Sequence, residues 1–213
     1  MRLRVLRHAA PDYHRFRGTA AFFDAPLSPA GEAQLAPLVA RLRDDPPNHA
    51  YCSPTLRTMA TASAVAAGTG IRVECWTDLC EQGFLNGKSG LGRSQLAARF
   101  PLVTVPGTIA EEGWARGLQA TDDLPGSRRA QRVLDLLMQR HPRESDDDVL
   151  LVTHLGFADA LLRAVLGLGD AVGFSLDDAA ITSLHLTPTR AKVDYVNSCW
   201  HLSGRERPTA LPP

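Results

Sequence analysis

Short apolar segments that each lead into a histidine or an arginine constrain the fold of this sequence more than any other feature. Leu6-Arg7-His8 closes the first apolar run, Val149–Thr153 leads into His154, and Arg57 follows a third strand-like segment. A strand that carries a histidine at its C-terminal end, with a helix following, is how open α/β sheets build ligand sites. Two arginines and two histidines at one sheet edge would suit a phosphoryl group. We therefore expect phosphoryl chemistry at a histidine.

Strand-like apolar segments alternate with amphipathic helical segments along most of the chain. This alternation predicts an α/β fold, a three-layer αβα sandwich with a mostly parallel sheet and an antiparallel edge strand. The predicted strands are Leu3–His8, His49–Cys52, Arg72–Trp76 and Val149–Thr153, followed by a hairpin of Ile181–Leu186 and Lys192–Asn197 with its turn at Thr187–Arg190.

The helices begin with recognisable signals. Ser28 can cap a helix with Pro29 at its first position, and Ser53-Pro54 repeats that arrangement, which puts Arg57 in the first turn of the next helix. Further predicted helices are Arg93–Phe100, Arg128–Arg140 and Phe157–Leu166. Glycine, proline and polar residues interrupt the pattern between 83 and 126. We expect one domain over residues 1–213, with a lid or specificity insertion around 83–126.

The composition favours a small soluble ligand. At 213 residues and 44% hydrophobic content, the chain can bury one large core. Lys plus Arg and Asp plus Glu both number 23, so the chain has no global field of the kind that nucleic-acid or membrane-surface binding needs. No apolar run approaches the ~18–20 residues of a membrane span, and the N-terminus lacks a signal-peptide layout. We expect a cytoplasmic protein without a nucleic-acid or membrane partner.

The cysteines give no sign of a metal or redox centre. None of the four belongs to a Cys-x-x-Cys pair, which disfavours a zinc ribbon and a redox motif. Cys52 and Cys75 lie in strand-like segments and are expected to be small buried apolar residues. No metal site is predicted.

Five motifs occur in the order typical of one protein family. They are Arg7-His8-Ala9, Pro26–Gln34, Ser53–Ala62, Asp78–Phe84 and Val152–Gly156. With these motifs the sequence resembles the histidine phosphatase superfamily, which also contains the cofactor-dependent phosphoglycerate mutases. The resemblance runs from about Leu3 to His201 and implies a phosphoglycerate mutase-like fold.

The resemblance also implies a reaction, a metal-independent phosphatase that works through a phosphohistidine on His8 and needs no cofactor. A neutral imidazole is a competent nucleophile near neutral pH. Arg7 and Arg57 would supply forked, charged donors to the phosphate oxygens. His154, in its imidazolium form, would donate to the same oxygens. Glu81 would be the general acid for the leaving group and then the base for water. Its rivals in the sequence are Glu74, Asp78, Glu111 and Glu112.

Several positions depart from the family pattern. Ala9 replaces the usual glycine after the first histidine, and His14 stands where an asparagine often contacts phosphate. His14 can donate a hydrogen bond as asparagine does. Leu155 occupies a position that is commonly glycine, where the backbone N–H can still approach a phosphate. Arg15 and Arg17 could meet further substrate anions, although a solvated pair explains them equally well.

Three alternatives stay open at this stage. A phosphoglycerate mutase-type phosphotransferase would use the same residues, but such relatives tend to be longer with a more elaborate lid. A catalytically weak phosphate-binding or protein-binding module is favoured by the departures above and opposed by the intact motifs. A metallohydrolase is the least favoured, because the chain lacks a cluster of metal-ligand spacing. It would have to use His8, His14, His154 and Asp12.

Specificity is expected to reside in the segment Gly83–Gly126. Its candidate pocket residues are Phe84, Arg93, Arg99, Trp114 and Arg116. A small phosphorylated substrate is predicted, while its identity and the oligomeric state of the protein are not.

Overall fold

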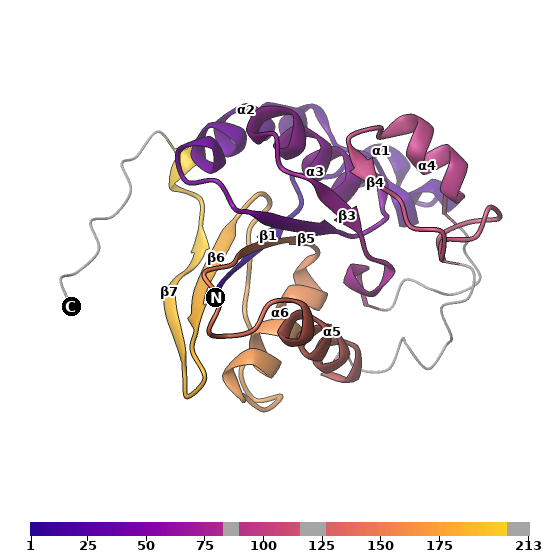
Figure 1. The fold of residues 1–213 in the computed structure, drawn as a ribbon. Coiled ribbons are helices and arrows are strands. Elements are labelled where there is room, and N and C mark those ends of the chain that lie inside the picture. Colours follow the sequence, from indigo (N-terminus) through magenta and orange to yellow (C-terminus); the bar gives the residue numbers. More distant parts are fainter. Residues whose placement is uncertain (83–89, 116–126, 204–213) are drawn as a thin grey trace.

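The computed structural model describes residues 1–82, 90–115 and 127–203. Within them, seven strands form one sheet in the order β4-β3-β2-β5-β1-β6-β7 (Figure 1). The strands are β1 (Arg2–Arg7), β2 (His49–Cys52), β3 (Val73–Cys75), β4 (Val103–Thr104), β5 (Asp148–Thr153), β6 (Ile181–Leu186) and β7 (Ala191–Ser198). Strands β1 to β5 are parallel to one another, β6 is antiparallel to β1, and β7 is antiparallel to β6. The predicted sheet with its antiparallel edge is confirmed.

Helices cover both faces of the sheet (Figure 1). The longer ones are α2 (Pro29–Asp44) and α3 (Leu56–Thr69) on one face, and α5 (Ser127–Arg140) and α6 (Leu155–Leu166) on the other. The shorter ones are α1 (Tyr13–Phe16), α4 (Arg93–Arg99) and the 3-10 helices η1 (Ala20–Asp24), η2 (Thr77–Leu79) and η4 (Trp200–Leu202). None of the described helices is long and apolar enough to cross a membrane. The three-layer architecture is the one that the sequence predicts.

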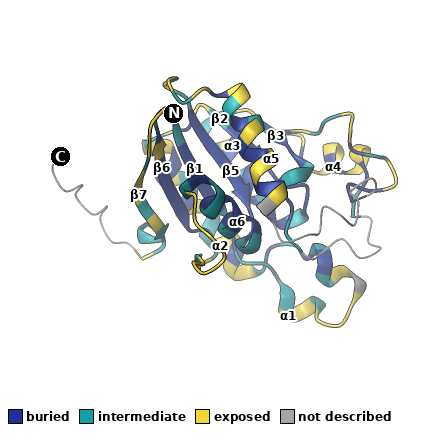
Figure 2. Cartoon of the chain, turned by 90° about the horizontal axis from the view of Figure 1, so that it is seen from below, coloured by how far each residue is buried: buried dark blue, intermediate teal, exposed yellow. Residues whose placement is uncertain are grey.

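Alternation along the strands divides the core into two clusters. Leu6 and Val152 pack under α2 and α3, whereas Val5 and Leu151 pack against α5 and α6. All four side chains are fully buried. Successive side chains on a strand point to opposite faces, and the loss of apolar area from water stabilises both layers. Figure 2 shows the interior strands as buried and β7 as a mixture of exposed and intermediate residues, so the sheet has a partly solvated edge at its antiparallel end.

Strand boundaries agree with the prediction to within a residue or two, and the hairpin turn is confirmed by the Thr187 N–H donating to the Arg190 carbonyl at 2.9 Å. His8 lies just beyond β1 rather than within it. The sequence reading missed β4 and α1. Both are too short to show a period.

Two helix starts differ from expectation. α3 begins at Leu56, after Thr55 in extended conformation, instead of at Pro54. Its first turn is capped from another segment, because Oδ1 of Asp24 accepts the Leu56 N–H at 2.7 Å. α6 begins at Leu155, two residues before the predicted start, with His154 as its N-cap residue. Arg57 does lie in the first turn of α3 as expected.

Candidate active site

Three neighbouring strands end in the residues that form the site. His8 directly follows β1, Ser53 follows β2 and His154 follows β5, and these strands are adjacent in the order β2-β5-β1. The C-terminal ends of parallel strands therefore bring residues from distant parts of the chain to one edge. His8, Ser53 and His154 are almost completely buried.

Hydrogen bonds at both ring nitrogens orient His8. Its Nδ1 lies 2.9 Å from the Ala9 carbonyl oxygen, and its Nε2 accepts from Nε of Arg57 at 3.2 Å. Since the carbonyl can only accept and the guanidinium can only donate, the proton belongs on Nδ1 and the lone pair on Nε2. Burial and the charge of Arg57 hold the pKa of His8 well below its usual value. The site keeps this ring neutral.

Arg57 bridges the two histidines. Its guanidinium is fully buried, and Nη2 lies 3.1 Å from Nδ1 of His154 while Nη1 donates to the Phe23 carbonyl at 3.2 Å. The rings of His8 and His154 are 5.1 Å apart between centroids. A rigid planar fork between two imidazoles matches the requirement for bidentate phosphate recognition.

The contacts of His154 in this arrangement suit a neutral ring, and the imidazolium expected from the sequence beside the phosphate oxygens stays a prediction. Its Nδ1 accepts from Arg57, and its Nε2 lies 2.8 Å from the Ser53 hydroxyl. Burial, followed by the charge of Arg57, lowers the pKa of His154 well below its usual value. A bound dianion would offset that charge and favour proton uptake.

Glu81 contacts the N-terminus of α6, the helix that begins directly after His154. Its Oε2 accepts the Gly156 N–H at 3.2 Å, and its Oε1 accepts the Phe157 N–H at 3.1 Å. A carboxylate at a helix N-terminus is stabilised by the unpaired backbone donors and the helix dipole. A Cβ atom at position 156 would come within 2.7 Å of Glu81 Oε1. This contact explains why glycine suits the position.

The rival carboxylates have other partners. Glu74 pairs with Arg140, Asp78 pairs with Arg132, and Glu111 pairs with Arg93 while it caps α4. Glu112 is exposed. Of the five carboxylates considered from the sequence, Glu81 is the one that contacts the helix following His154.

The backbone after His8 is fixed by residues of two later motifs. The Ala9 N–H donates to the Thr61 hydroxyl at 3.1 Å, and the Ala10 N–H donates to Gln34 Oε1 at 2.8 Å. Ser28 donates both its N–H and its hydroxyl to the Ala10 carbonyl. A Cβ on Gly31 would lie 2.1 Å from that same carbonyl oxygen. The spacing of the motif Pro26–Gln34 thus lets Ser28 and Gln34 bind the backbone of the same residue, Ala10, and hold the loop after His8.

Arg7 is held by the segment before β6. Its Nη1 donates to the Leu176 carbonyl at 2.5 Å, and its Nη2 forms an ion pair with Asp178 at 2.9 Å. Its charge contributes to lowering the pKa of both His8 and His154. Burial raises the pKa of Asp178. Arg7 therefore faces the site while a carboxylate limits its freedom.

Tyr13 was not considered from the sequence, yet it joins the site. Burial raises its pKa, and the phenol also lies within range of the charges of Arg57, Glu81, Arg7 and Asp178. The Arg57 guanidinium lies 5.6 Å from the centroid of its ring. The sequence could not predict that Tyr13 lies at the site, because α1 is a single turn and shows no helical period.

Asp24 is a second residue that sequence reasoning missed. In addition to capping α3, its Oδ2 accepts from Trp114 Nε1 at 3.5 Å, and burial raises its pKa. Trp114 is buried and stacks on Phe23, with centroids 5.3 Å apart. The described part of the predicted insertion is therefore packed beside the first turn of α3. Its function as a lid stays a prediction.

Other candidate residues lie further out. His14, Arg15 and Arg17 are exposed, and no described hydrogen bond or ion pair joins them to the buried histidines. Leu155 is half-buried at the start of α6 and packs on the core. Arg93 pairs with Glu111, and Arg99 lies over the ring of Phe100. Phe84 and Arg116 fall outside the described residues. His14 and Asp12 do not join the buried histidines in a metal-ligand cluster within the part of the chain that the structure describes.

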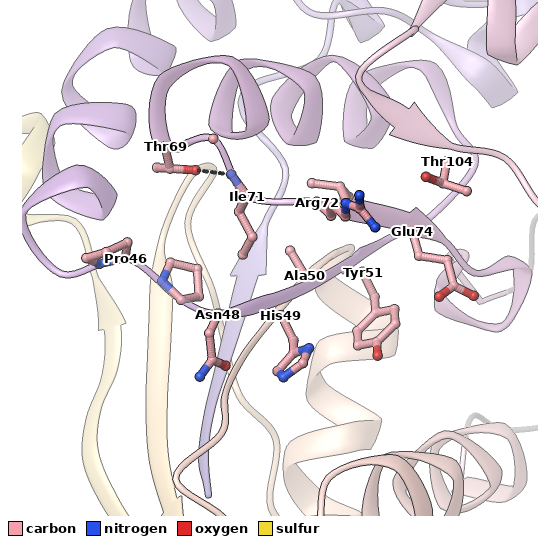
Figure 3. Close-up of a pocket in the computed structure, with 13 residues that line it drawn as sticks. Pro46, Asn48, His49, Ala50, Tyr51, Thr69, Ile71, Arg72, Glu74 and Thr104 are labelled. Atoms are coloured by element: carbon pink, nitrogen blue, oxygen red, sulfur yellow. Dashed lines mark hydrogen bonds between the residues drawn. The ribbon is translucent and has the colours of Figure 1, made fainter.

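A hollow of about 710 Å³ lies at the opposite edge of the sheet, at the N-terminal ends of β2 and β3. Figure 3 shows His49 and Tyr51 on one face of β2 at this hollow, with Ala50 on the other face. None of its lining residues belongs to the site around His8.

Comparisons with known proteins show the family and the fold of the chain. Residues 3–198 match the family model described as histidine phosphatase superfamily (branch 1). No curated protein sequence matches significantly. A mycobacterial glucosyl-3-phosphoglycerate phosphatase in complex with VO3 is 25% identical with a TM-score of 0.63, over 92% of this chain and 99% of that one.

Two further structures share the fold. A putative alpha-ribazole-5'-P phosphatase from Escherichia coli is 19% identical with a TM-score of 0.64, over 93% of this chain and 96% of that one. A mutant phosphoserine phosphatase from Entamoeba histolytica, solved with phosphoserine, is 17% identical with a TM-score of 0.63, over 94% and 98%.

Proposed function

The chain belongs to branch 1 of the histidine phosphatase superfamily, and we propose that it is a metal-independent phosphatase that hydrolyses a phosphomonoester through phospho-His8. The observation that carries the proposal is the orientation of His8. Its unprotonated Nε2 faces the Arg57 fork while its Nδ1 is tied to the Ala9 carbonyl. A nucleophilic nitrogen and a phosphate-binding cation thus meet in one buried space.

In the first step, Nε2 of His8 attacks phosphorus and the bond from phosphorus to the ester oxygen breaks. Arg57, Arg7 and His154 stabilise the negative charge on the non-bridging oxygens. The leaving oxygen takes the proton of the Glu81 carboxyl group and departs as an alcohol. The phosphoimidazole retains its proton on Nδ1, where the Ala9 carbonyl accepts it.

In the second step, Glu81 is a carboxylate and accepts a proton from the attacking water. The new bond from oxygen to phosphorus forms as the bond from phosphorus to Nε2 breaks. Inorganic phosphate leaves, His8 returns to its neutral form and Glu81 is protonated again. The hydrogen bonds from Gly156 and Phe157 hold the Glu81 carboxylate beside the helix that follows His154 and support its role as the base of this second step.

A small phosphorylated molecule is the proposed substrate class. The related structures carry the names of phosphatases for phosphoserine, glucosyl-3-phosphoglycerate and alpha-ribazole phosphate. These three esters form the first substrate panel for this chain.

The test is hydrolysis of p-nitrophenyl phosphate with and without excess chelator. We expect chelator-resistant turnover in the wild type, its loss in His8→Ala, and its retention in the matched control His185→Ala, whose side chain is exposed on β6. Acid-labile label on the protein after rapid denaturation would identify the phosphohistidine.

Other results would contradict hydrolysis. A long-lived phosphohistidine without release of phosphate would favour the mutase-type phosphotransferase. Phosphate binding without any covalent label would favour a binding module. Loss of turnover with chelator alone would overturn the metal-free mechanism.

A further inference from the structure

Three residues with metal-binding side chains meet at the N-terminal ends of the parallel strands, on the side of the sheet away from the active site. His49 is the first residue of β2, His141 directly follows α5, and Asp147 directly precedes β5. One ligand atom from each lies within 4.8 Å of the other two. No motif in the sequence indicates this group, because its members come from three separate elements without a metal-site spacing.

Both imidazoles point a nitrogen at the same carboxylate. Nε2 of His49 lies 3.3 Å from Asp147 Oδ1, and Nδ1 of His141 lies 2.9 Å from Asp147 Oδ2. The ring centroids are 4.4 Å apart. In a tetrahedral zinc site with bonds of about 2.0–2.1 Å, neighbouring ligand atoms are about 3.3 Å apart. The two distances from the imidazoles to Asp147 are near this value, and with all three ligand atoms within 4.8 Å of one another a small shift of the exposed His49 ring completes the spacing.

A second layer of contacts orients the buried histidine. Nε2 of His141 lies 2.8 Å from the Tyr51 hydroxyl, which leaves Nδ1 directed at Asp147. Metal-ligating histidines generally have such a partner on their other nitrogen, because it fixes the tautomer and the ring plane. The backbone of Asp147 is also held, since its carbonyl accepts the Arg2 N–H at 2.7 Å.

The burial of the three side chains suits an ion that enters from solvent. The His141 side chain is 4% exposed, Asp147 is 25% exposed and His49 is 41% exposed. His49 also borders the hollow in Figure 3, where its ring projects from β2 beside Tyr51. His141 is thus held in the interior, while His49 is accessible from solvent.

Nearby cations are already paired with other carboxylates. Arg2 forms ion pairs with Asp45 and Asp148, and Arg4 shares the same two partners. These ion pairs therefore balance most of the positive charge of the two arginines near Asp147.

We propose that His49, His141 and Asp147 bind one Zn²⁺ ion, with water as the fourth ligand. Two imidazoles and one carboxylate favour zinc and similar transition metals over Mg²⁺ or Ca²⁺, which prefer all-oxygen sites. In the metal-bound form His141 is a neutral imidazole whose Nδ1 lone pair binds the ion, and its one ring proton lies on Nε2, where the Tyr51 hydroxyl oxygen accepts it. It joins the start of β2 to the connection between α5 and β5.

This site is structural rather than catalytic. β2 separates His49 from Ser53 by roughly 13 Å at ~3.3 Å per residue, so the ion does not reach the phosphate. An ion bound to the folded chain alone raises stability by mass action. The inference is independent of the proposed function.

The experiment uses the full chain, free of any tag and stripped with chelator, titrated with Co²⁺ and then with Zn²⁺. We expect one equivalent of Co²⁺ to give a visible absorption band, which Zn²⁺ abolishes, and Zn²⁺ to raise the unfolding temperature. His49→Gln, at an exposed position, should weaken binding by 100-fold or more. His14→Gln is the matched control at an exposed histidine elsewhere, and binding should persist in it.

His8→Ala excludes binding at the proposed catalytic histidines and should retain the full stoichiometry. Phosphatase turnover in His49→Gln should equal that of the wild type. The proposal is overturned if the chain binds no stoichiometric ion, if His49→Gln binds as tightly as the wild type, or if His8→Ala abolishes binding.

Discussion

Nε2 of His8 lies 3.2 Å from Nε of Arg57, at the centre of the buried site. This relationship decides the state of the ring, because a guanidinium donates and only an unprotonated nitrogen can accept. It also places the phosphate-binding cation next to the nucleophile. An incoming phosphoryl oxygen can take over the donor as the nitrogen attacks.

Arg57→Lys should lower kcat/KM for an aryl phosphate by roughly 100-fold or more. A lysine cannot reach His8, His154 and a bound phosphate together, and each charge-assisted hydrogen bond contributes about 1.5–3 kcal/mol. Steady-state kinetics measure the loss. Arg15→Lys is the exposed control. Equal losses in both variants would remove the special role of Arg57.

The protonation states of His8 and His154 can be read by nitrogen-detected NMR of the ligand-free protein. Because both pKa values are lowered by burial and by Arg57, neither ring should take up a proton between pH 7.5 and pH 6. The expected tautomers carry hydrogen on Nδ1 of His8 and on Nε2 of His154. Imidazolium signals at pH 6.5 would contradict this assignment.

The same shifts predict how stability depends on pH. An unfolded histidine gains a proton below about pH 6.5, whereas the folded rings of His8 and His154 do not. Their contribution to stability is complete above that pH and is lost as the pH falls. Asp148, whose pKa burial raises to about 6, has the opposite sign. Urea unfolding at pH 7 and pH 5 should therefore show a smaller acid loss in His154→Gln than in the wild type.

Gly156→Ala should reduce kcat by tenfold or more while the fold is retained. The added methyl group would come within 2.7 Å of Glu81 Oε1 and displace the carboxyl group, although alanine itself favours a helix. Gly173→Ala is the matched control, since its Cβ meets only Asp159 Oδ1 at 3.8 Å. Unchanged kcat in Gly156→Ala would argue against Glu81 as the acid.

Thr61→Val should destabilise the protein by about 1–3 kcal/mol, because it leaves the buried Ala9 N–H without its acceptor. Turnover should also fall as the loop after His8 loosens. Thr69→Val, near the end of the same helix, is the control, since it removes a half-buried hydroxyl that donates to the Val65 carbonyl and accepts only a long hydrogen bond, 3.4 Å, from the Ile71 N–H. Chemical denaturation of the two variants makes the comparison. Equal effects would mean that the contact with Ala9 is unimportant.

Much of the fold follows from local sequence. The apolar run Val149–Val152 of β5 is continuous because this strand is covered on both faces, and Ser28 with Pro29 is a sufficient start for α2. The Thr187–Arg190 turn is likewise local. The start of α3 could not be read in this way, since its cap comes from Asp24, more than thirty positions earlier.

The sequence by itself determined the family, the layered sheet and the choice of His8, Arg57, Glu81 and His154, because motif spacing and apolar periodicity are encoded along the chain. Tertiary structure decided what lies beside these residues. It placed Tyr13 and Asp24 at the site, left His14 in solvent, and lowered the pKa of His154 through burial next to Arg57. Contacts between side chains from separate elements, and the desolvation that shifts a pKa, depend on packing and strand register, which no local pattern specifies.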